Sequence, residues 1–241
     1  MIAAYILIVL GVAVWSVLIP TGKRFSDSAM RAVTVFGGAF LLGVCALELL
    51  PELAEGCSQP HAVGAAIQQL PFVAILIGFI VQQALESLSA HAEHGHVEGH
   101  GDGAPVVGLM IGLCLHAFLE GMPLVEADGS LNNGLLWGIV IHNIPVAVIL
   151  VALLSARRMH FWQVLVLLLV FGLMSPIGSL FNLYVVQPDG FGRSVMLGLV
   201  VGVLLHVSSS ILFDHKRHHF SWLNLALSAM AFLAAWLIIQ L

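Results

Sequence analysis

Eight long apolar stretches constrain this chain more than any other feature. Each is close to the 20 or so apolar residues that a helix needs to cross a bilayer. Only 9% of the 241 residues are charged, whereas a soluble domain is about 25% charged. The sequence therefore predicts an all-α integral membrane protein, one domain over residues 1–241, with eight transmembrane helices. The predicted spans are Ile2–Pro20, Ala32–Pro51, Ala66–Ser89, Pro105–Val125, Asn132–Ala156, Phe161–Val185, Ser194–Phe213 and Trp222–Gln240.

The positive residues predict how the helices are oriented. Of the eight Lys and Arg residues, all but Arg193 lie in or beside odd-numbered loops. Because Lys and Arg concentrate in cytoplasmic loops, we expect these loops in the cytoplasm and both termini on the non-cytoplasmic side. The first stretch has no basic start and no small-residue cleavage site, so we expect it to be retained. The expected location is the plasma membrane or a bacterial inner membrane.

The third loop, residues 90–104, is rich in histidine and glycine. Such a segment cannot bury enough apolar surface to fold alone, and the alternative to metal binding is a disordered polar linker. Histidine-rich tracts are typical of metal binding, and imidazole with carboxylate suits first-row divalent cations. No basic patch with interleaved aromatic residues points to nucleic acid, so the expected partners are a metal ion and the bilayer. The candidate ligands in this loop, which the charge distribution makes cytoplasmic, are His91, His94, His96 and His100.

The fourth and fifth spans each carry a histidine at their centre. His116 and Glu120 are four residues apart and share one helix face, while His142 is followed by Asn143. Ionisable groups in a membrane usually face the bundle interior or a hydrated path. Pro145 removes a backbone donor, which frees the Ile141 carbonyl at the same depth. The sequence thus predicts that the two spans meet and hold a divalent cation between His116, Glu120, His142 and Asn143.

Other polar residues within the spans are ambiguous between pathway lining and structural hydrogen bonding. Gln82 and Gln83 lie near Glu86 in the inner half of the third span, and serines follow His206 in the seventh. Serine in a membrane helix often bonds its own backbone. The further candidate metal ligands from this group are Glu48, Glu86, His206 and Asp214.

The pattern resembles the ZIP family of divalent-metal transporters. Taken together, the order of the motifs, their spacing and the eight-span topology carry the resemblance. The motifs are Glu48-Leu49-Leu50-Pro51-Glu52, His116-x-x-x-Glu120-Gly121, His142-Asn143-Ile144-Pro145 and Ser175-Pro176-Ile177-Gly178. The resemblance implies movement of Zn²⁺, or Fe²⁺, Mn²⁺ or Cd²⁺, into the cytoplasm, and a homodimer. It also implies that His116, Glu120 and His142 are primary-site ligands and that Asn143 belongs to a second site.

The chain departs from the family pattern at two positions. Val146 stands where the fifth helix usually carries an acid, and Ala117 stands where a second polar ligand often follows the histidine. With one carboxylate, the site is expected to bind one metal rather than two. A set of two His and one Glu leaves a fourth position for water.

Three functions other than metal transport are compatible with these residues. A zinc ion held by two His and a Glu can activate water, but a membrane metal-dependent hydrolase would need a separate general base, and no His-Glu-x-x-His motif is present. A proton-coupled carrier would use the His and Glu groups as a relay. The chain would otherwise be a non-transporting member of the family. We therefore expect a transporter, not an enzyme, with the metal as substrate and no cofactor.

Overall fold

The computed structural model describes residues 1–18, 27–58, 69–94, 104–125, 129–186, 190–213 and 222–240. Within these ranges the chain is almost entirely helical. The longer helices are α1 (Ile2–Leu18), α2 (Asp27–Val44), α5 (Leu70–His94), α6 (Ala104–Gly121), α7 (Asn133–Ala156), α8 (Phe161–Phe181), α9 (Gly190–Leu212) and α10 (Trp222–Ile239). The shorter ones are α3 (Leu50–Ser58), the π-helices η1 (Cys45–Leu49) and η3 (Asn182–Val186), and the 3₁₀ turn η2 (Met122–Leu124).

The prediction of an all-α membrane protein is confirmed. Among the described residues, seven helical runs are long and apolar enough to cross a membrane, and Ile2–Trp15 of α1 is a shorter apolar helix. At 1.5 Å per residue, the 17 residues of α1 reach about 25 Å, just short of the hydrocarbon thickness. The side on which the termini lie stays a prediction.

The second span is longer than the sequence indicated. Pro51 was expected to end it, yet α2, η1 and α3 form one continuous run, and the apolar span covers Ser28–Cys57. The π-helix explains this, because the backbone N–H of Leu50 donates to the Cys45 carbonyl five residues back. A wide turn of this kind lets the helix continue past a proline that lacks its own donor.

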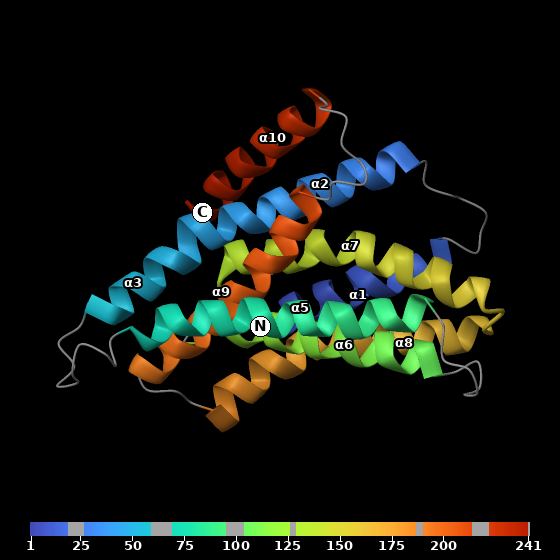
Figure 1. Ribbon diagram of the computed structural model, residues 1–241, viewed down its shortest axis with the longest axis horizontal. Coiled ribbons are helices and arrows are strands. Elements are labelled where there is room, and N and C mark those ends of the chain that lie inside the picture. Colours follow the sequence, from blue (N-terminus) through green and yellow to red (C-terminus); the bar gives the residue numbers. More distant parts are fainter. Residues whose placement is uncertain are drawn as a thin grey trace.

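The helices form one bundle with two apolar cores. α10 and α2 lie on one side, α6 and α8 on the other, and α7 runs between them (Figure 1). The first core joins α2, η1, α3, α9 and α10 with the first half of α7, including Leu135 and Ile139. The second core joins α6 and α8 with the second half of α7, from Ala147 to Leu154. His142 and Asn143 therefore lie where one core gives way to the other.

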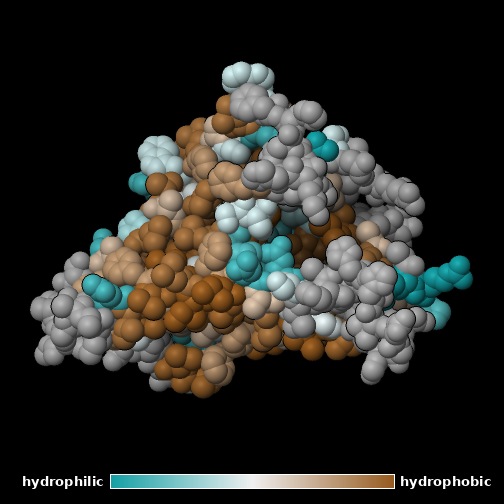
Figure 2. Space-filling model, viewed as in Figure 1, coloured by the Kyte–Doolittle hydropathy of each residue, from teal (hydrophilic) through white to brown (hydrophobic). Residues whose placement is uncertain are grey.

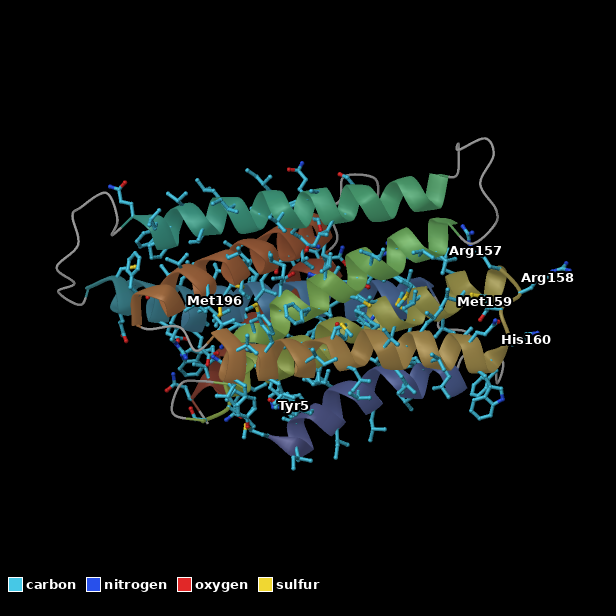
Figure 3. All side chains as sticks on the ribbon, turned by 90° about the horizontal axis from the view of Figure 1, so that it is seen from below. Tyr5, Arg157, Arg158, Met159, His160 and Met196 are labelled. Carbon is cyan, nitrogen blue, oxygen red and sulfur yellow. The ribbon has the colours of Figure 1, made fainter. Side chains whose placement is uncertain are left out.

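The connection between α7 and α8 carries exposed positive residues. Arg157, Arg158 and His160 lie at this turn, at one end of the bundle (Figure 3). Arg158 has a φ of 56°, a conformation uncommon for residues other than glycine. The predicted cytoplasmic side is the side on which this turn lies.

Candidate metal centre

The four residues predicted to hold a cation are all buried inside the bundle. His116 and Glu120 lie one turn apart on α6, and His142 and Asn143 lie in the middle of α7. Glu120 is completely buried, with 0% of its surface exposed. None of these side chains is exposed on the outer surface of the bundle, whereas their role as metal ligands stays a prediction.

The candidate ligands His116 and Glu120 on α6 lie close to each other, and His142 on α7 lies beside His116. His116 Nε2 lies 3.6 Å from Glu120 Oε2, which is too long for a hydrogen bond. The His116 and His142 rings meet edge to face, with their centroids 5.9 Å apart. Within the part of the chain that the structure describes, no three His, Cys, Asp or Glu side chains stand close enough together to hold an ion. Coordination by all three residues therefore requires these side chains to move closer to one another.

Several polar atoms of this cluster lack hydrogen-bond partners among the described residues. They are His116 Nε2, both carboxylate oxygens of Glu120, His142 Nδ1 and the side-chain amide of Asn143. Leaving a buried polar group unpaired costs about 1–3 kcal/mol, and more for a charged group. Such a cluster makes these residues candidates for binding something other than the protein itself.

The other nitrogen of His116 is paired, with a residue that the sequence did not connect to it. His116 Nδ1 lies 3.1 Å from Gln82 Oε1 of α5, and both side chains are buried. The sequence places Gln82 in the third span and indicates no partner for it. The contact joins residues 34 positions apart, so only the packing of α5 against α6 reveals it.

Close backbone contacts hold the helices around the cluster. A side chain added at Gly121, next to Glu120, would overlap the backbone of Ser175 on α8, and one at Gly178 would overlap the Phe118 carbonyl on α6. On the opposite side, a methyl group added at Gly37 of α2 would lie 3.5 Å from His142 Cα. These glycines let α6 pack onto α8, and α2 onto α7, at the depth of the candidate ligands.

The lower-ranked candidates are distributed more widely. His206 Nδ1 on α9 lies 3.5 Å from Glu86 Oε2 on α5, and its ring meets Phe79 edge to face. His206 and His142 both lie within electrostatic range of His116. Glu48 lies instead against Gly134 at the start of α7.

The loop candidates cannot be placed to the same extent. His91 and His94 belong to the last turns of α5. Asp214, His96 and His100 lie outside the described residues.

The comparisons with known proteins bear on the family of this chain. A protein-family model described as ZIP Zinc transporter matches residues 90–239, which is more than half of the chain. The matched region includes the candidate ligands on α6 and α7 but not Gln82 or Glu86 of α5. A search of curated proteins found no match.

Proposed function

Because the chain belongs to the ZIP zinc transporter family, whose members move divalent metals across membranes, we propose that it carries Zn²⁺ into the cytoplasm through a site formed by His116, Glu120 and His142. The observation that supports this most directly is the buried cluster of unpaired nitrogen and oxygen atoms on α6 and α7. Two imidazoles and a carboxylate are ordinary zinc ligands, and the same set accepts Fe²⁺ and Mn²⁺.

The charge at the site favours transient binding. One carboxylate neutralises half the charge of a divalent cation, and the remaining positive charge is costly in a low-dielectric interior. The amide oxygen of Asn143 and a retained water molecule would complete the coordination without adding negative charge. A cation held in this way exchanges its hydration shell for protein ligands but is not trapped.

The two cores supply a means of opening the site first to one side of the membrane and then to the other. His116 and Glu120 sit on α6, which belongs to the second core, whereas α2 and α9 belong to the first. Rocking of one group of helices against the other around a fixed site would give alternating access. No nucleotide-binding motif is present in the sequence, so we propose that a gradient drives transport.

The decisive experiment measures metal uptake into proteoliposomes that contain the purified protein. Wild type should accumulate Zn²⁺ faster than empty vesicles, and His116→Ala and His142→Ala should reduce uptake to background. His160→Ala is the matched control, because this histidine is exposed at the α7–α8 turn (Figure 3), and it should transport like wild type. Clear uptake that both buried-site variants leave unchanged would rule out this site. Flux that depends on pH but not on chelators would instead favour a proton carrier.

A further inference from the structure

The amide of Gln82 bears on which nitrogen of His116 can reach a cation. We propose that Gln82 is a positioning residue that holds neutral His116 with its proton on Nδ1, so that Nε2 presents a lone pair toward Glu120. The inference rests on the proposed metal-transport function and adds a residue to it. Gln82 lies on α5, outside the region that matches the family model.

An amide oxygen beside Nδ1 favours the tautomer that carries its proton there. A neutral imidazole carries one N–H, and the hydrogen bond made by one nitrogen determines the role of the other. With Gln82 Oε1 at 3.1 Å from Nδ1, the N–H donates to the amide oxygen. Nε2 is then left as the lone-pair nitrogen, 3.6 Å from Glu120 Oε2. Metal-binding histidines usually donate their second ring N–H to an oxygen in this way.

The alternative tautomer would close the site. His116 and Glu120 are four residues apart on one helix, so a proton on Nε2 would face the Glu120 carboxylate directly. Such a hydrogen bond would engage Nε2 and one Glu120 oxygen, both of which the cation needs. By accepting from Nδ1, Gln82 stabilises the arrangement in which the two ligands remain separate.

The position of Gln82 is itself fixed by the packing of its helix. α5 lies against α9 at backbone distance, since side chains added at Gly198 and Gly202 would overlap the carbonyls of Pro71 and Ile75. A helix held by backbone contact has little freedom to rotate or slide. Gln82 therefore approaches His116 from a rigid support rather than from a loop.

The direct test reads the tautomer by ¹⁵N NMR of histidine-labelled, metal-free full-length protein in lipid bilayers. The His116 signals are assigned by their loss in His116→Gln. Wild type should show a protonated Nδ1 and an unprotonated Nε2. Gln82→Leu should shift the population toward protonated Nε2. Gln82→Glu should retain the wild-type pattern, because a carboxylate can only accept.

Gln83→Leu is the matched control, because Gln83 is the next residue on α5 and is exposed; it should leave the pattern unchanged. If Gln82→Leu does not yield folded protein, Gln82→Met tests the same loss of an acceptor with a side chain of similar length. An unchanged His116 pattern in folded Gln82→Leu or Gln82→Met, or a protonated Nε2 in wild type, would overturn the proposal.

A second readout ties the tautomer to transport. Loss of an oxygen that orients a ligating histidine typically weakens metal affinity about 10–100-fold, so Gln82→Leu should raise the KM for Zn²⁺ uptake by that factor and change the maximal rate much less. Gln82→Glu should keep a KM near that of wild type. If the NMR result is as expected but neither the wild type nor any variant transports metal, the proposed function fails while the positioning role stands. If wild type transports and Gln82→Leu leaves both the NMR pattern and KM unchanged, the positioning role is wrong.

Discussion

Two histidines, His116 on α6 and His206 on α9, contact side chains of α5 that are one turn apart on that helix. The surroundings of the two histidines differ. His116 meets the neutral amide of Gln82, and its neighbour Glu120 is 0% exposed. His206 meets Glu86, whose side chain is 56% exposed. Figure 2 shows a hydrophilic patch near the middle of this face, with apolar surface beside it. Gln83 and Glu86 of α5 are both exposed.

The contrast separates two uses of similar residue types. A buried carboxylate gains most from a cation when, as here, neither of its oxygens accepts a hydrogen bond from the described residues. A half-exposed carboxylate interacts with solvent or headgroups, and its pairing with a histidine is worth little. We infer that the ion binds at His116 and Glu120 (the His116 region). His206 and Glu86 (the His206 region) lie nearby but do not hold the ion.

The largest effect should come from the buried carboxylate. Glu120→Gln keeps the shape of the side chain but removes the negative charge from the His116 region. Since residues that merely orient metal ligands cost about 10–100-fold, loss of this ligand should lower Zn²⁺ uptake at least about 100-fold. Uptake into proteoliposomes at matched protein density measures it. Retention of more than a tenth of the wild-type rate would contradict the contrast between the buried carboxylate of Glu120 and the exposed one of Glu86.

Next in size are two glycine substitutions that disturb one region each. Gly178→Leu forces α8 away from α6, and Gly202→Leu forces α9 away from α5, because each side chain would overlap a facing carbonyl. Overpacking costs about 1–3 kcal/mol, so both variants should unfold at lower temperature in detergent. Per folded molecule, Gly178→Leu should transport less than Gly202→Leu, because it displaces Glu120 itself, whereas Gly202→Leu shifts α5 and reaches His116 only through Gln82.

A third glycine provides the control for this pair. At Gly11 the nearest atom to an added methyl group is 4.0 Å away, so Gly11→Ala should match wild type in both stability and transport. Equal transport by Gly178→Leu and Gly202→Leu would show that the two regions are not distinct.

A smaller effect is expected at Glu86. Glu86→Gln removes the charge that faces His206 but leaves the buried cluster intact. We expect Zn²⁺ uptake to fall less than tenfold, which corresponds to less than about 1.4 kcal/mol. Titrating uptake against Zn²⁺ concentration would show it, and a loss as large as that of Glu120→Gln would place the binding site at His206 instead.

The smallest effect should lie outside both regions. Arg193 Nη2 and Glu52 Oε1 are 2.7 Å apart and join α9 to α3, with both side chains partly exposed. Pairs of this kind contribute about 0.2–1 kcal/mol, so Arg193→Gln should lower the unfolding temperature slightly and leave transport unchanged. A strong loss of transport would mean that the helices at this end control access to the site.

Much of the fold follows from the sequence, because the length of an apolar stretch and the bilayer thickness leave few alternatives. The i,i+4 spacing likewise determined that His116 and Glu120 share a face. The contact of His116 with Gln82 was not predictable, since it depends on how α5 packs against α6. Pro51 misled the sequence reading because proline commonly ends a helix, whereas here a π-helix absorbs it.

The π-helix η1 also bears on how related sequences should be aligned. A single-residue deletion within Cys45–Leu49 would restore regular α-helical geometry without interrupting the span. The residues beyond it would keep nearly the same direction, because a π turn contains about one residue more than an α turn. Glu52 would then still face Arg193, and Leu53 would stay in the first core. A gap at this place in a homologue would therefore signify the loss of the wide turn rather than a change of neighbours.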